Sequence, residues 1–198
     1  MSYERHNIKL VTKDLQTFVI NTPVLRFDII DSLCNCNVFF KCENFQHTGS
    51  FKYRAAINAI KKMPVEFKQT GVITHSSGNF AHALARAAYE LKIPCHIVMP
   101  NNTPNFKKSS VLSYTKNVVE CESNLESREF TTSEIFKNKN LYFIHPSNNM
   151  DVILGNSTCA AEFINDYPNL DSIFSPIGGG GLIAGTSIAI NNFSEHCQ

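Results

Sequence analysis

Short β-rich runs alternate with helical patterns along this chain of 198 residues, and the alternation constrains its fold more than any other feature. The β-rich runs lie at 37–42, 71–76, 95–100, 117–121, 141–146 and 172–177. The helical patterns repeat alanine and larger apolar residues and lie at 51–62, 80–91 and 182–190. Strands that alternate with helices form βαβ units, in which helices cover a parallel sheet. The sequence therefore predicts an α/β protein with parallel sheets flanked by helices. Polar pieces at 101–105, 123–132 and 138–140 are predicted connections or exposed helix ends.

Charge and cysteine usage exclude several classes of function. Lys and Arg number 18 against 17 Asp and Glu, a net charge of +1, so neither nucleic acid nor a membrane surface is an expected partner. The first ten residues mix charges without an apolar h-region, and no later stretch is long and apolar enough to span a bilayer. Seven scattered cysteines without a C-x-x-C pair favour reduced thiols and no metal site in this chain. We expect a soluble, cytoplasmic protein.

The last strand-to-helix junction, SPIGGGGLIAG at 175–185, contains four consecutive glycines: Gly178, Gly179, Gly180 and Gly181. Consecutive glycines let several backbone N–H groups point to one place, and the following helix adds its positive end, so the natural ligand is a phosphate. The pattern G-x-x-x-x-G-K-[ST] is absent, and Ile183 replaces the third glycine of G-x-G-x-x-G. Neither a nucleoside triphosphate nor a dinucleotide is favoured. A flexible turn without a ligand is the alternative.

The middle junction, THSSGNFAHAL at 74–84, places Ser76, Ser77 and Asn79 between a strand and an alanine-rich helix. These side chains are common helix caps, and capping alone is one interpretation. The other is a binding loop, because hydroxyl, amide and free backbone N–H donors gathered at one point suit a carboxylate or a ring oxygen.

The first junction, FQHTGSFKYRAAINAI at 45–60, places Lys52 at the start of an apolar helix. A lone lysine there could extend to solvent beside Arg54. We expect instead that the helix dipole and Arg54 both oppose the charge of the amine and favour its neutral form, which can attack an aldehyde to form a Schiff base. A lysine together with a phosphate loop suggests pyridoxal phosphate.

The motifs TGSFKYR, HSSGNFA and PIGGGGLIAG, in this order, resemble those of the fold type II (tryptophan synthase beta-like) pyridoxal-phosphate enzymes, specifically the serine racemase and serine/threonine dehydratase branch. NTPVL at 21–25, VFFKCENFQ at 38–46, CESNLESRE at 121–129 and IHP at 144–146 are also similar. The resemblance implies a small domain at 48–145 flanked by parts of a large domain at 1–47 and 146–198. It also implies pyridoxal 5'-phosphate as cofactor, a small amino acid as substrate and a homodimer.

Residue by residue, the resemblance implies a complete set of roles. Lys52 would bind the cofactor as a Schiff base and exchange the α-proton on one face, and Ser77 would be the acid/base on the other face. Asn79 would bind the ring hydroxyl and Phe51 would pack near the pyridine. Gly178, Gly179, Gly180 and Gly181 would bind the phosphate. Ser76, Ser77 and Asn79 would receive the substrate carboxylate.

Several positions depart from the family pattern. Phe80 replaces the histidine of S-G-N-H-G-Q, Ala55 replaces the glycine of R-G-A, and GNST at 155–158 replaces G-Q-G-T. Phe27 and Asp28 replace serines at the nucleotide effector site of animal serine racemases, so activation by ATP is not expected. The chain ends at Gln198, where relatives continue. That missing part would complete the large domain and would carry the divalent-metal ligands and the residue facing the pyridine nitrogen.

Three hypotheses follow. The first is a lyase or racemase acting on L-serine or L-threonine, by elimination to a 2-oxo acid and ammonia or by racemisation to D-serine. The second is a truncated, non-catalytic relative that binds pyridoxal phosphate or a partner subunit. The third is an α/β protein that binds another phosphorylated small molecule, with Lys52 incidental.

Overall fold

The fold was analysed in a computed structural model, which describes residues 5–198. Residues 1–4, part of the N-terminal stretch expected to lack an h-region, lie outside the described residues. The α-helices are α1 (Arg5–Leu15), α2 (Asp28–Cys34), α3 (Lys52–Lys62), α4 (Asn79–Glu90), α5 (Asn105–Leu112), α6 (Leu125–Lys139), α7 (Met150–Asp166) and α8 (Gly181–Phe193). The strands are β1 (Val24–Arg26), β2 (Phe39–Lys41), β3 (Val72–His75), β4 (Cys95–Pro100), β5 (Val118–Cys121) and β6 (Tyr142–Phe143). Short 3-10 turns lie at Glu43–Phe45, His47–Gly49 and Val65–Phe67.

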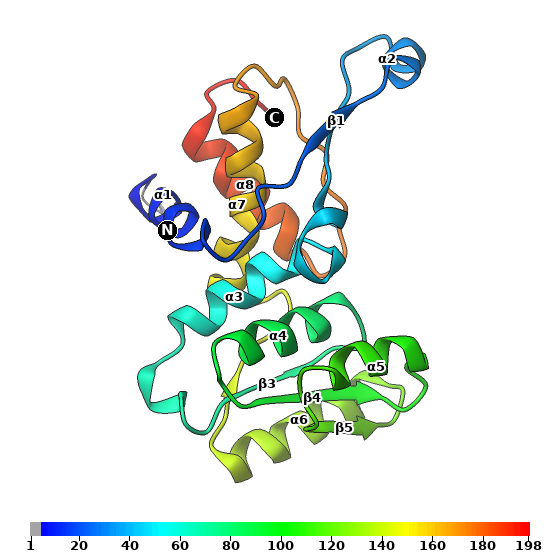
Figure 1. The fold of residues 1–198 in the computed structure, drawn as a ribbon, viewed down its shortest axis with the longest axis vertical. Coiled ribbons are helices and arrows are strands. Elements are labelled where there is room, and N and C mark those ends of the chain that lie inside the picture. The colour runs from blue at the N-terminus through cyan, green and yellow to red at the C-terminus, as the bar shows by residue number, and fades with distance from the viewer. Residues whose placement is uncertain (1–4) are drawn as a thin grey trace.

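A four-stranded parallel sheet has the order β5-β4-β3-β6, so that β3 and β4 are its central strands. Helices α4 and α5 lie on one side of this sheet and α6 lies on the other (Figure 1). The residues of β3 are all buried, as expected for a strand covered on both faces. The predicted strands at 71–76, 95–100, 117–121 and 141–146 and the α/β class are confirmed.

A second layer consists of helices, in which α7 packs between α3 and α8 (Figure 1). Two glycines of this layer let helix backbones approach closely. A Cβ on Gly155 of α7 would lie 2.5 Å from the Arg54 carbonyl oxygen of α3, and a Cβ on Gly185 of α8 would lie 2.6 Å from the Ile153 oxygen of α7. Apolar residues of α1, α3, α4, α7 and α8 and of β3 and β4 share one hydrophobic core.

Two predicted strands have a different outcome. The run 37–42 contains β2, but β2 pairs antiparallel with β1, with Val24 opposite Lys41, and is not part of a parallel sheet. The run 172–177 is not a strand, so that prediction was wrong. The Ile173 N–H donates a hydrogen bond of 2.7 Å to the Gln198 carbonyl oxygen, and Phe174 is 95% exposed. A strand needs a neighbouring strand for its backbone groups, and among the described residues none lies beside this segment.

The patterns missed several helices, chiefly α6 and α7. The polar pieces at 123–132 and 138–140, predicted as connections or exposed helix ends, are the two ends of α6, so the second alternative is confirmed, although the helix between them was not predicted. Asn124 caps its start by accepting a hydrogen bond from the Ser127 N–H, and Asn140 ends it in the left-handed conformation. Helix α7 is buried along much of its length, so it shows no clear polar face.

Membrane spans, metal sites and thiols were the remaining expectations for residues 5–198. No helix in this range has the length and apolar character needed to cross a membrane. No group of three or more His, Cys, Asp or Glu side chains in the same range is placed to bind a metal ion. The seven cysteines are free thiols.

Candidate active site

The three junctions singled out by the sequence meet at Pro146 and Ser147, which follow β6. The Nζ of Lys52 donates a hydrogen bond of 2.9 Å to the Pro146 carbonyl oxygen. The next residue, Ser147, lies against the glycine loop (residues 178–181), because its Oγ is 2.5 Å from the place where a Cβ on Gly179 would be. Ser76 and Ser77 line one cavity together with Pro146 and Ser147. The structure therefore brings Lys52, the serine loop (residues 76–79) and the glycine loop to one place.

Lys52 is the first residue of α3 and is half-buried. Its Nζ lies 5.1 Å from the centre of the Phe51 ring and 5.6 Å from the centre of the Phe80 ring. Burial lowers the pKa of Lys52 below its ordinary value, because desolvation disfavours the charged amine. The expected direction of the shift agrees with this environment. Arg54 does not contribute to lowering the pKa of Lys52, contrary to expectation, because burial is the one cause of the shift.

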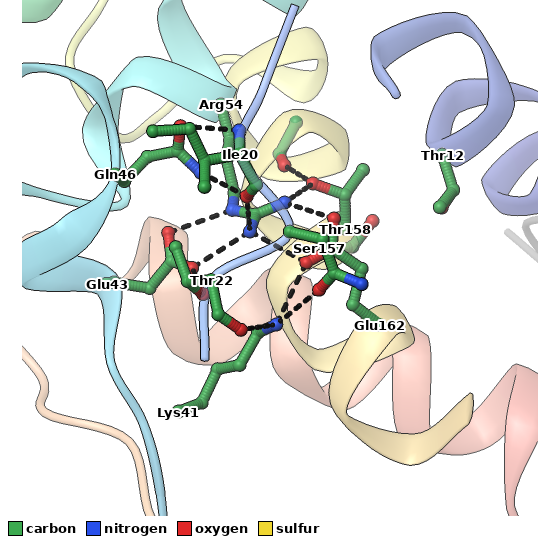
Figure 2. Close-up of polar contacts among 12 residues, drawn as sticks. Thr12, Ile20, Thr22, Lys41, Glu43, Gln46, Arg54, Ser157, Thr158 and Glu162 are labelled. Carbon is green, nitrogen blue, oxygen red and sulfur yellow. Dashed lines mark hydrogen bonds and ion pairs between the residues drawn. The ribbon is translucent and has the colours of Figure 1, made fainter. Parts of the chain in front are cut away.

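Arg54 points instead into a buried network of charged groups between α3, α7 and the segment 20–43 (Figure 2). Its guanidinium donates to both carboxylate oxygens of Glu43, at 2.8 and 2.9 Å, and to both of Glu162, at 2.7 and 2.8 Å. Lys41 adds an ion pair of 3.0 Å to Glu162. Burial opposes the charge of Arg54, but the hydrogen bonds to the two carboxylates outweigh it and raise its pKa. The network anchors α3 two residues after Lys52.

The serine loop does not cap α4 with its side chains. The N-cap residue is Gly78, with no side-chain hydrogen bond, and the Ser76 hydroxyl accepts a 3.3 Å bond from the Gly78 N–H. Ser76 and Ser77 are partly exposed and Asn79 is exposed, whereas Phe80 is only 2% exposed. The first-turn N–H groups of α4 are therefore without a side-chain acceptor, as an anion site requires.

The glycine loop leads directly into α8, which begins at Gly181. Gly180 is the N-cap and has φ +83°, a left-handed conformation that favours glycine, and no side chain caps the helix. Gly178 and Gly179 are exposed. Free N–H groups at a helix start, on a backbone without side chains, form a site suited to a phosphate.

The cavity beside the serine loop has a volume of about 380 Å³, within the usual range for small-molecule sites. Sequence reasoning assigned no role to several residues that line it: His75, Leu125, Arg128, Glu129, His145, Pro146 and Ser147. The Nε of Arg128 is buried without a hydrogen-bond partner. The signal available was the resemblance of 121–129, but helix α6 was not predicted, so nothing placed Arg128 in the same cavity as Ser77.

His145 shows how the loop after β6 is fixed. Its Nδ1 accepts hydrogen bonds from the backbone N–H groups of Ser147, at 3.1 Å, and Asn148, at 2.8 Å. Burial lowers the pKa of His145, which favours the neutral ring that can accept these bonds. His145 therefore holds the loop that contacts both Lys52 and the glycine loop.

The fold and the site together define a class, namely α/β proteins in which a lysine, a serine loop and a glycine loop meet beyond the ends of parallel strands. The family model described as "Pyridoxal-phosphate dependent enzyme" matches residues 15–197, and the chain belongs to this family.

Individual relatives agree with this family. The chain is 38% identical to a serine racemase of Dictyostelium discoideum, over 97% of this chain and 59% of that protein. It is 39% identical to a beta-hydroxyaspartate dehydratase of Paracoccus denitrificans (strain Pd 1222), over 93% of this chain and 58% of that protein. A crystal structure of serine racemase from Dictyostelium discoideum superimposes with a TM-score of 0.94 at 36% identity, covering all of this chain (100%) and 64% of that one. The chain thus spans about three fifths of the length of the curated relatives it matches. The predicted fold type II class and the serine racemase and dehydratase branch are confirmed.

Proposed function

We propose that the protein is a pyridoxal-phosphate-dependent lyase or racemase acting on L-serine or L-threonine. The observation that carries the proposal is the meeting of Lys52, the serine loop and the glycine loop around Pro146 and Ser147. The residues present fit the cofactor. A phosphate suits the side-chain-free start of α8, and a half-buried amine with a lowered pKa suits attack on an aldehyde.

The protein residues would divide the work of binding and proton transfer. The cofactor, when bound, supplies an electron sink that stabilises negative charge on the substrate Cα. Lys52 would bind the cofactor covalently and, once substrate displaces it, move the α-proton at its Nζ. The glycine loop would bind the phosphate, Asn79 the ring hydroxyl and Phe51 the ring edge. Ser76, Ser77 and Asn79 would bind the substrate carboxylate.

Ser77 decides between the two reactions. Elimination of the β-hydroxyl needs proton transfer on one face only, whereas racemisation needs a second acid/base on the opposite face. Ser77 lines the same cavity as Pro146, whose carbonyl oxygen accepts from the Lys52 amine, and Ser77 and Lys52 come from different segments of the chain. This arrangement supports Lys52 and Ser77 as the pair.

Assays of pyruvate and D-serine formed from L-serine test the function. We expect Lys52→Ala to abolish both products. Ser77→Ala should lower D-serine formation about a hundredfold more than pyruvate formation, a general acid/base contribution. Ser76→Ala is the matched control, because loss of a carboxylate contact alone should lower both products equally. Equal losses in Ser77→Ala would remove its assignment as the second acid/base.

The second candidate is a non-catalytic relative that binds the cofactor or a partner subunit. Phe80 favours it, because an apolar ring replaces the family's imidazole next to the proposed carboxylate site. Cofactor binding without either product would support this candidate.

The resemblance supports three further proposals about the whole protein. The first is a cytoplasmic homodimer. Sedimentation of the purified chain would test the dimeric state. The second is a small domain at 48–145 with parts of a large domain at 1–47 and 146–198. The third places the ligands of any divalent metal outside residues 1–198.

A further inference from the structure

Asn156, on α7, is a buried amide without a hydrogen-bond partner among residues 5–198. Its side chain is 0% exposed, and neither its Nδ2 nor its Oδ1 has a hydrogen-bond partner in the structure. Buried polar side chains nearly always have a partner, and an amide with both ends unsatisfied is a costly exception. An unsatisfied Nδ2 is a hydrogen-bond donor available to an acceptor on a bound ligand.

The residues next to Asn156 on α7 have no unsatisfied side-chain atoms. Gly155 allows the close approach of α3, since a Cβ there would lie 2.5 Å from the Arg54 carbonyl oxygen. The Ser157 hydroxyl donates to the Leu154 carbonyl at 2.6 Å, and the Thr158 hydroxyl donates to the Gly155 carbonyl at 2.8 Å. The unsatisfied amide is therefore confined to position 156 and is not a general property of this helix segment.

The amide faces the start of α8. Its Nδ2 lies 3.4 Å from the place where a Cβ on Gly181 would be, and Gly181 is the first residue of α8. The first-turn N–H groups of that helix also lack acceptors, because the N-cap Gly180 carries no side chain. The helix start and the Asn156 amide, two independent sets of donors, thus lie close together at Gly181.

We propose that Asn156 is a phosphate ligand, whose Nδ2 donates to an oxygen of the phosphate bound by the glycine loop. The proposal rests on the proposed function for the identity of the phosphate, which would be that of pyridoxal 5'-phosphate. The group that Asn156 would bind is a phosphate dianion, which several N–H donors can bind without a cationic side chain. Gly181 has no side chain, so the helix start and the amide can reach the same oxygen group.

The test compares a ligand with the phosphate and one without it. Dissociation constants of pyridoxal 5'-phosphate and of pyridoxal are measured for the unchanged chain and for Asn156→Leu, which has a similar shape and no donor. We expect the constant for pyridoxal 5'-phosphate to rise about tenfold or more, the loss of one hydrogen bond to a charged group, while that for pyridoxal stays within about twofold. Equal changes for both ligands, or none, would overturn the proposal.

A control variant and the melting temperature without ligand separate binding from folding. Thr74→Val removes another fully buried oxygen, on β3, that has no partner among residues 5–198, and it should leave both constants unchanged. Without ligand, Asn156→Leu should melt no lower than the unchanged chain, because it removes a buried unsatisfied amide. If it fails to fold, Asn156→Asp replaces it, since a carboxylate of the same shape should repel the phosphate and again spare pyridoxal.

Inorganic phosphate distinguishes failure of this inference from failure of the proposed function. If the unchanged chain forms no lysine-dependent absorption band with pyridoxal 5'-phosphate, the proposed function fails. Phosphate binding, followed by ³¹P line broadening, then still tests Asn156. Binding that is lost in Asn156→Leu and kept in Thr74→Val supports the phosphate ligand. Absence of phosphate binding in the unchanged chain contradicts it.

Discussion

Lys52 and Arg54 lie two residues apart on α3, yet their surroundings are opposite. Arg54 is 0% exposed and shares hydrogen bonds with Glu43 and Glu162 (Figure 2). Lys52 is half-buried, donates one hydrogen bond to a backbone carbonyl, and among residues 5–198 has no carboxylate within ion-pair distance. One charge is compensated by the protein itself, whereas the other is left available for chemistry.

The same contrast extends to the residues around each cation. Around Arg54, Lys41 pairs with Glu162 and the Thr22 hydroxyl donates to Glu43. Around the candidate site, polar atoms of His75, Arg128 and Asn156 are buried without partners. The Arg54 network is satisfied by the protein itself, whereas the candidate site contains polar atoms that a bound ligand could satisfy.

The largest expected effect is on the Arg54 side of this comparison. Arg54→Met leaves the carboxylates of Glu43 and Glu162 without their main partner, and should lower the free energy of unfolding by about 3–5 kcal/mol. Lys52→Met loses one hydrogen bond and should lower it by about 1 kcal/mol or less. Urea unfolding of both variants measures the difference. Equal losses would contradict the division between a structural and a functional cation.

A smaller effect on stability is expected when a Cβ is added at Gly155 than when Arg54 is replaced, and Gly178 provides the comparison. A Cβ on Gly155 would lie 2.5 Å from the Arg54 carbonyl oxygen, a backbone atom that cannot move aside easily, whereas a Cβ on Gly178 meets nothing within 4 Å. Gly155→Ala should therefore destabilise the protein by about 1–3 kcal/mol, by forcing α3 and α7 apart. Gly178→Ala is the matched control and should leave the unfolding midpoint nearly unchanged. A neutral Gly155→Ala would show that the contact between these helices is looser than described.

The smallest expected effect is a shift in the titration of Lys52. Burial lowers its pKa from the ordinary value of 10.5, so the neutral amine forms at lower pH in the folded chain. Acylation by acetic anhydride requires the neutral amine, so the pH profile of labelling at Lys52 should have a lower midpoint in the folded chain than in the chain unfolded by urea. Mass spectrometry of the Lys52 peptide measures both profiles. Identical midpoints would mean that the site does not activate the lysine.

The sequence predicted the three junctions of the site because each depends on local chemistry. Lys52 begins α3, Ser76 and Ser77 separate β3 from α4, and four glycines precede α8. Strand and helix patterns are local properties, so their alternation was sufficient to predict the α/β class and the central parallel sheet.

What the sequence did not reveal depends on contacts between distant segments. Arg54 was expected to act on its neighbour Lys52, but its partner Glu162 is 108 positions away along the chain. Arg128 reaches the cavity from α6, whose polar sequence predicted only connections or exposed helix ends. The apolar run 172–177 has the composition of a strand, but a strand also requires a neighbour to pair with. These outcomes are set by tertiary packing, which the local patterns do not encode.

The visible absorption spectrum of the purified chain with pyridoxal 5'-phosphate, before and after addition of L-serine, tests the central claim most directly when Lys52→Ala is measured beside it. We predict an absorption band that requires Lys52 and changes on addition of L-serine. A band that persists in Lys52→Ala, or no band in a folded chain, would contradict the assignment of Lys52 as the cofactor-binding residue.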